Sequence, residues 1–96
     1  MNLEIVVSVK ARIDLRAIAD YIARDSRSAA TRMIKRLERE INQLGTQPGI
    51  GEQCDYLSPD LRRMSCGVYL LYYKLREDHL EIVRVLHGAR DVENLF

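Results

Sequence analysis

A chain of 96 residues is long enough for one small domain and too short for two. Apolar residues make up 47% of it and charged residues 30%, a balance that is typical of soluble globular proteins and argues against a disordered chain. The formal net charge is only +1, which argues against a nucleic-acid binder held by bulk charge but allows a local basic patch.

The sequence shows no sign of export or of a membrane anchor. Its apolar segments are far shorter than the roughly 20 residues that a membrane-spanning helix needs, and its first residues lack the layout of a signal peptide. The two cysteines, Cys54 and Cys66, form no CxxC motif, so the sequence favours buried reduced thiols over a disulfide or a zinc site. We therefore expect a cytoplasmic protein without a metal or another cofactor.

The first half of the chain predicts one strand and two helices. Residues 3–9 are rich in β-branched side chains and suit a strand. Ser8 and Ser28 are candidate N-caps for the two helices, and Gly45 is a candidate C-cap for the second. Apolar residues then recur at helical spacing, in the first helix at Ala11, Leu15, Ile18 and Ile22 and in the second at Ala30, Met33, Ile34, Leu37, Ile41 and Leu44.

The second half changes to the pattern of strands. Residues 49–59 predict a loop that contains a short strand near residues 53–56. Because strands joined by short turns pair antiparallel, we predict an α+β fold in which an N-terminal strand and an antiparallel helical hairpin are followed by a mainly antiparallel sheet, with the hairpin packed on one face. The remaining segments are strands over residues 61–66, 68–75 and 80–87 and a short tail over residues 89–96.

One polar cluster is predicted at the end of the last strand. His87 lies between Arg84 and Arg90, with Asp91 close by, and such a group could bind an anion or transfer protons. Alternatively, Arg84 pairs with an acid across the sheet, and Asp91 pairs with Arg90 or a backbone amide. No catalytic triad, metal-ligand cluster or phosphate-binding loop is evident. The helical carboxylates are expected to face solvent: Asp14, Asp20, Glu38 and Glu40.

The second helix is strongly basic. Six cations and two acids lie between Arg24 and Arg39, which gives this stretch a local net charge of +4 (six minus two). Most of these side chains lie off the apolar stripe. They form either a solvated face with intrahelical pairs such as Arg36–Glu40, or a docking surface for an acidic segment or a phosphate backbone.

Three tyrosines crowd the long strand over residues 68–75. Alternation places Tyr69 and Tyr73 on the face opposite Tyr72. Since the helices cover only one face, we expect exposed aromatic area on the other face, which often marks a partner site. Core packing accounts equally well for at least one of the three.

Together these segments resemble the ParE branch of the RelE/ParE toxin superfamily, over nearly the whole chain. The most specific segment is IVRVLHGARD followed by a terminal LF. The other matching segments are DLRAIADYIARDS, the helix over residues 30–44, QPGIGE, Leu61-Arg62 and GVYLLYYKL. The resemblance implies a helical hairpin against an antiparallel sheet, and a type II toxin that a cognate ParD-like antitoxin neutralises.

The resemblance also implies a mode of action. ParE-like members are associated with poisoning DNA gyrase, whereas RelE-like relatives cut messenger RNA on the ribosome. Those nucleases typically carry a basic residue before the hairpin glycine and a Tyr or His near the C-terminus, where this chain has Met64 and Phe96. We therefore expect a binding toxin with no catalytic residues, no membrane contact and no sequence-specific nucleic-acid binding of its own. The alternatives are a RelE-type endoribonuclease that uses His87 and the arginines, and a toxin-like protein that only binds its partner.

Two sets of contact residues follow from position and chemistry. Cations and an aromatic residue near the sheet end and tail are expected to contact the gyrase: Arg62, Arg84, His87, Arg90 and Phe96. Residues of the basic helix and the long strand are expected to contact the antitoxin, which should present an acidic and apolar segment: Arg32, Arg36, Arg39, Tyr69 and Tyr73.

Overall fold

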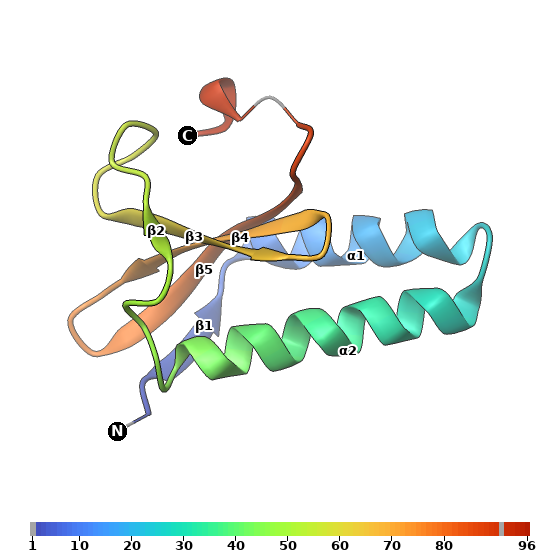
Figure 1. Cartoon of the computed structure of the whole chain (residues 1–96), viewed down its shortest axis with the longest axis horizontal. Coiled ribbons are helices and arrows are strands. Elements are labelled where there is room, and N and C mark those ends of the chain that lie inside the picture. The colour runs from blue at the N-terminus through green and yellow to red at the C-terminus, as the bar shows by residue number, and fades with distance from the viewer. Residues whose placement is uncertain (1, 91) are drawn as a thin grey trace.

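The computed structural model describes residues 2–90 and 92–96, and Figure 1 shows the chain as a helical hairpin beside a twisted sheet. The helices are α1 (Val9–Ala23) and α2 (Arg27–Leu44), with a short 3-10 helix, η1 (Glu93–Leu95), in the tail. The strands are β1 (Glu4–Val7), β2 (Glu52–Gln53), β3 (Leu61–Cys66), β4 (Tyr69–Leu75) and β5 (His79–His87).

The five strands form one sheet in the order β1-β5-β4-β3-β2. β1 pairs with β5 in parallel, and the other three pairings are antiparallel. The predicted α+β fold with a mainly antiparallel sheet is therefore confirmed. The predicted short strand begins earlier than expected and is only two residues long, so β2 pairs with just Arg62 and Arg63 of β3.

The ends of the helices are set by serine and glycine. The Ser8 hydroxyl accepts a hydrogen bond from the Ala11 amide at 3.1 Å, as predicted, and donates to the Val83 carbonyl of β5 at 2.9 Å. The prediction of Ser28 as the second N-cap is wrong. Ser26 caps α2, because its backbone is extended just before the helix and its hydroxyl accepts from the Ala29 amide. Gly45 is the C-cap of α2, as predicted.

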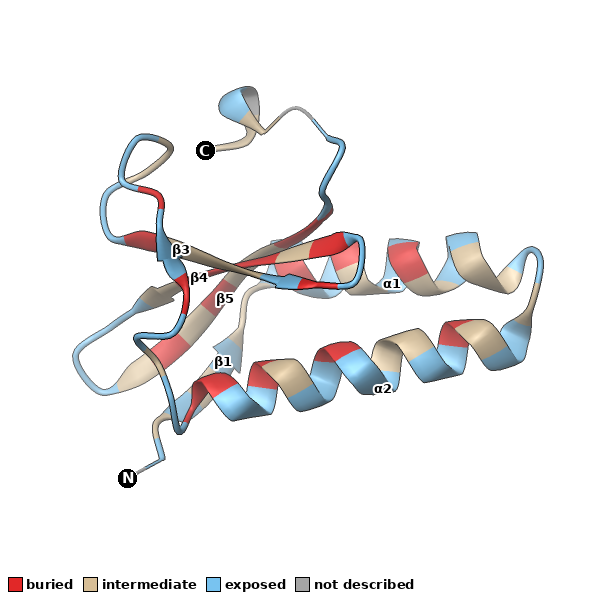
Figure 2. Cartoon of the chain, in the orientation of Figure 1, coloured by how far each residue is buried: buried red, intermediate tan, exposed pale blue. Residues whose placement is uncertain are grey.

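The helix-side face of the sheet holds the larger core. Two fully buried residues, Leu37 of α2 and Ala11 of α1, pack against buried side chains of β4 and β5. Figure 2 shows buried residues, in red, along both helices and along the strands of the sheet. The strand residues in this cluster are Cys66, Tyr69, Leu71, Tyr73, Leu80, Ile82 and Val85. Burial of this apolar area, at about 25 cal/mol per Å², is the main force that holds the hairpin to the sheet.

The opposite face of the sheet carries a second, smaller core. Tyr72 and Leu86 pack there with Cys54 and Leu61 from the loop and β3. Half-buried residues of the loop, the strands and the tail cover them: Leu57, Leu70, Val83, Val92, Leu95 and Phe96. The tail therefore crosses the face that the helices leave open. Cys54 and Cys66 are buried and free, as the sequence favoured.

A bulge interrupts the alternation of side chains along β5. Tyr73 pairs with Ile82 while Tyr72 pairs with Arg84, so Val83 is an extra residue on β5. The extra residue shifts the alternation of β5, so that Ile82 and Val85, three residues apart, both face the helix-side core.

None of the described helices is long and apolar enough to span a membrane.

Candidate functional site

The polar cluster at the end of β5 divides into a buried part and an exposed part. Arg84 belongs to the buried part: its Nε and Nη2 donate to the two carboxylate oxygens of Asp14 at 2.7 and 2.9 Å. The Val85 amide donates to the same carboxylate at 3.0 Å. These contacts fasten α1 to the middle of β5, and the hydrogen bonds from Arg84 to Asp14 raise the pKa of Arg84 above its ordinary value.

This pair corrects two predictions from the sequence. Asp14 does not face solvent, because its side chain is only 9% exposed and points to β5. The Arg84 side chain is 13% exposed and is committed to Asp14, so its guanidinium is not a free contact for a target. The alternative that Arg84 pairs with an acid is confirmed, although the acid comes from α1 and not from across the sheet. Asp91 lies outside the described residues.

His87 and Arg90 form the exposed part of the cluster. The Nδ1 atom of His87 accepts a hydrogen bond from the Ala89 amide at 3.0 Å, so the neutral ring carries its proton on Nε2. The His87 and Tyr69 rings meet in a T-shaped arrangement, with 5.7 Å between the ring centres and an angle of 82° between the planes. His87 and Arg90 thus present a donor and a cation to solvent just before the tail.

A groove begins beside these two residues. It runs between α1 and the turn that joins β3 to β4, and its volume is about 520 Å³. Tyr21 of α1 and Val68 of the turn line it together with His87 and Arg90, and both apolar side chains are more than half exposed. Sequence reasoning missed these two residues. The available signal was that Tyr21 lies beside the apolar stripe of α1 and Val68 directly follows the turn glycine.

Arg62 and Phe96, two further predicted target contacts, are partly occupied within the chain. The Nη1 atom of Arg62 donates to the carbonyls of Gly51 and Gly49 at 2.9 and 3.3 Å, so this arginine holds the loop before β2. The Phe96 ring packs on Tyr72 with 4.9 Å between ring centres. Met64 is half-buried against the helix-side core. The structure therefore does not bring Arg62, Arg84 and His87 together into one catalytic corner.

The expectation of exposed tyrosines was wrong. Tyr69 and Tyr73 do lie on the face opposite Tyr72, but that face is the one that the helices cover, so they are 6% and 0% exposed. The Tyr73 hydroxyl donates to the Pro48 carbonyl and accepts from the Gly51 amide, both at 2.8 Å. Tyr72 is buried as well, because the tail covers its face. In the chain alone, Tyr69 and Tyr73 are core residues and not surface anchors.

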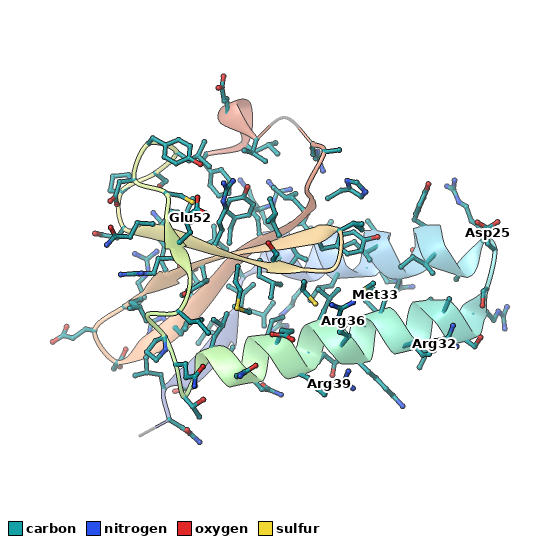
Figure 3. All side chains as sticks on the ribbon, viewed as in Figure 1. Asp25, Arg32, Met33, Arg36, Arg39 and Glu52 are labelled. Atoms are coloured by element: carbon teal, nitrogen blue, oxygen red, sulfur yellow. The ribbon has the colours of Figure 1, made fainter. Side chains whose placement is uncertain are left out.

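The basic helix keeps its predicted character. Arg32, Arg36 and Arg39 are all exposed along α2 (Figure 3). Arg36 reaches toward the β3–β4 turn, since a Cβ placed on Gly67 would lie 3.2 Å from its Nη1 atom. Beside this helix, residues 64–66 of β3 pair with β4 on one side and have no strand on their outer edge in the described part of the chain. A row of cations thus lies near an open strand edge.

Within residues 2–90 and 92–96, no group of three His, Cys, Asp or Glu side chains could hold a metal ion. The exposed site is instead made of cations, apolar side chains and backbone edges. Such surfaces bind other macromolecules through charge and buried apolar area.

Comparison with known proteins identifies the family to which the chain is similar. The model of the family described as ParE toxin of type II toxin–antitoxin system, parDE, matches residues 5–92. Toxin ParE1 of Mycobacterium tuberculosis is 34% identical over 65 residues, which cover 67% of this chain and 66% of ParE1, just under two thirds of that relative. Toxin RelE2 of Caulobacter vibrioides is 32% identical over 87 residues, which cover 91% of this chain and 97% of RelE2.

A solved structure shows the same fold. The match, described as the chromosomal ParDE TA system from P. aeruginosa, has a TM-score of 0.77 at 18% identity and covers 88% of this chain and 95% of that chain. The family model covers far more than half of the sequence, over a range that contains both helices and strands β2 to β5. The chain belongs to the ParE toxin family.

Proposed function

We propose that this protein is the toxin of a type II toxin–antitoxin pair, that it arrests growth by binding DNA gyrase, and that a cognate ParD-like antitoxin neutralises it. Membership of the ParE toxin family supports the toxin role. One observation favours binding over catalysis: Arg84, central to the predicted catalytic corner, is engaged by Asp14 in the interior.

The target surface in this proposal is the exposed end of β5 with the tail. His87 and Arg90 supply polar and cationic contacts, and the neighbouring groove offers the apolar side chains of Tyr21 and Val68. Interfaces of this kind are typically anchored by aromatic residues and arginine. The tail contributes Phe96, whose ring is only half-buried.

The antitoxin surface in this proposal is the basic side of α2 and the open edge of β3. An acidic and apolar segment would place its carboxylates against Arg32, Arg36 and Arg39. A strand from the same segment could pair with the outer edge of β3 beyond Arg63, where alternate backbone groups point away from β4. Charge on the rim would mainly speed association, whereas the strand pairing would slow dissociation.

A supercoiling assay with purified gyrase tests the target. The wild-type toxin should abolish supercoiling with accumulation of cleaved DNA, and added antitoxin should reverse the effect. Arg90→Ala, and removal of Leu95 and Phe96, should each raise the required toxin concentration by about tenfold or more while antitoxin binding persists. Arg76→Ala is the matched control, because Arg76 pairs with Glu81 near the other end of β5. Full potency of both tail variants would remove the tail from the target surface.

Ribosome-dependent cleavage of messenger RNA is the second candidate, and the similarity to RelE2 favours it. In this reading His87 would transfer protons and the nearby arginines would bind phosphate. Mapping of transcript ends after induction tests it. Codon-positioned cuts that disappear in His87→Ala would favour the nuclease, whereas intact transcripts during arrest would exclude it. Normal growth on expression would instead indicate a protein that binds its antitoxin without toxicity.

A further inference from the structure

The exposed side of α2 carries a cluster of cations without an acid among them. We call these four exposed side chains the α2 crest: Arg32, Lys35, Arg36 and Arg39. At 3.6 residues per turn they share an arc of roughly 100° on the helix and extend about 10 Å along its axis. Arg32, Arg36 and Arg39 follow one another along α2 in Figure 3. The nearest acids of the helix, Glu38 and Glu40, lie outside this arc on either side.

The α2 crest works against the stability of its own helix. Cations three or four residues apart on a helix repel one another. The crest contains four such pairs: Arg32–Lys35, Arg32–Arg36, Lys35–Arg39 and Arg36–Arg39. In the described part of the chain none of the four residues joins an ion pair, so the pair Arg36–Glu40 considered from the sequence is not formed. A helix face that serves only solubility alternates its charges, and solubility therefore does not account for the crest.

The surroundings of the crest select the chemistry of its partner. The large apolar side chains that are exposed in the described chain lie on β1, α1, β4, the loops and the turns, and none lies on α2. The exposed neighbours of the crest are polar: Ser28, Asn42 and Gln43. Protein interfaces are anchored by apolar and aromatic side chains. Phosphate backbones are instead held by arginine and lysine, with hydrogen bonds from serine, asparagine and glutamine. The crest matches a phosphate backbone.

The charge of the whole chain is divided in the same sense. Residues 24–39 carry a net charge of +4, whereas the whole chain carries +1, so the remaining residues carry −3 (+1 minus +4). This division repels a polyanion from the rest of the surface and turns α2 toward it. A duplex carries about one negative charge per 1.7 Å of its axis, so the crest faces about six phosphate charges along its length.

We infer that the α2 crest binds the phosphate backbone of duplex DNA without reading its sequence. The choice of DNA among polyphosphates rests on the proposed action on gyrase, whose substrate is duplex DNA. The crest holds the toxin on that DNA, while the end of β5 and the tail contact the enzyme. An acidic antitoxin segment covers the same cations, so antitoxin and DNA exclude one another on α2.

Fluorescence anisotropy of a labelled DNA duplex of about 20 base pairs, titrated with the full chain, tests this inference. The wild type should bind two unrelated sequences equally, and its affinity should fall about 100-fold between about 50 and 200 mM salt, as expected for four phosphate contacts. The double variant Arg32→Gln with Arg39→Gln should weaken binding at about 50 mM salt by about tenfold or more, and it should lower the slope of log affinity against log salt by about two.

A matched control removes the same charge elsewhere. Lys10 and Arg76 are exposed on α1 and after β4, and the double variant Lys10→Gln with Arg76→Gln should weaken binding by no more than about threefold. Thermal unfolding should show the crest variant to be at least as stable as the wild type, because the substitutions relieve like-charge pairs. A crest variant that unfolds at a lower temperature would make these arginines structural and would overturn the inference.

Other outcomes separate this inference from the proposed function. A wild type that leaves the duplex unbound at about 50 mM salt would overturn the inference, as would equal losses in the crest and control variants. Binding of an RNA duplex of the same sequence about tenfold more tightly than DNA would also overturn it. If the wild type poisons gyrase in the supercoiling assay without binding DNA, only this inference fails. If it binds DNA through the crest and leaves gyrase active, the crest is confirmed and gyrase is removed as the target.

Discussion

The two faces of the sheet are covered in different ways, and the difference separates what holds the protein together from what is free to bind. On the helix-side face, two long helices bury a large cluster, and a paired carboxylate and guanidinium fasten α1 to β5. On the other face, a loop and a short tail cover a smaller cluster that includes Tyr72 and Leu86. The tail residues that cover it are themselves half-buried.

In our proposal the tail has two roles at once. Phe96 covers Tyr72, and it also lies in the segment proposed to contact the gyrase. A residue that is only half-buried can be recruited by a partner at a small cost to the fold. Changes on the helix-side face should therefore act through stability, and changes in the tail should act mainly through binding. Four substitutions test this difference, and they are given in order of their expected effect on the free energy of unfolding.

The largest effect is expected for Asp14→Ala. It leaves the Arg84 guanidinium in the interior without its partner and also removes the acceptor of the Val85 amide. Loss of one member of such a buried pair costs about 3–5 kcal/mol. Urea denaturation measures the change. Asp20→Ala is the control, since its pair with Arg16 is exposed and should contribute no more than about 0.5 kcal/mol. Equal effects of the two substitutions would contradict the assignment of Asp14.

Tyr73→Phe should follow. The hydroxyl is the acceptor for the Gly51 amide and the donor to the Pro48 carbonyl, so the change leaves two backbone groups of the loop unpaired. We expect a loss of about 1–3 kcal/mol in the free energy of unfolding. Hydrogen exchange should show the effect concentrated in residues 48–53. An unchanged exchange rate at Gly51 would show that water replaces the hydroxyl.

Phe96→Ala should cost less stability than either of these. The ring is half-buried, and its contact with Tyr72 is an aromatic pair with 4.9 Å between ring centres. We expect a loss of about 1 kcal/mol, read as a shift of the denaturation midpoint. In the supercoiling assay the same variant should lose far more potency than this shift explains. A parallel loss of stability and potency would instead mean that the tail acts only by covering the sheet.

The smallest effect is expected for Tyr72→Phe, the neighbour of Tyr73 on the opposite face. Among the described residues the buried Tyr72 hydroxyl accepts no hydrogen bond of good geometry, although it lies near the cross-strand neighbour Arg63 and raises the pKa of that guanidinium. Its removal should change stability by no more than about 0.5 kcal/mol, and in the stabilising direction if at all. Thermal unfolding of the two tyrosine variants side by side makes the comparison direct. A large loss in Tyr72→Phe would show that its hydroxyl bonds to the Arg63 guanidinium of β3.

Much of this protein was determined by local sequence pattern. The spacing of apolar residues predicted both helices, and β-branched and alternating segments predicted the strands, because these periods reflect backbone geometry that each segment adopts by itself. The predicted end of the last strand at His87 also placed the exposed cluster of His87 and Arg90 there. The alternation correctly set Tyr72 against Tyr69 and Tyr73.

Tertiary structure alone decided which of these surfaces is exposed. Alternation divides the side chains of a strand between two faces, but it does not show which face the helices cover. It also cannot show that residues 92–96 fold back over the opposite face of the sheet. The pairing of Asp14 with Arg84 joins positions 70 residues apart, so no local sequence pattern predicts it. A second apolar row of α1 shows the reverse case. Its apolar spacing is present in the sequence, but only the packed fold shows that Val9, Ile13 and Tyr21 remain in solvent.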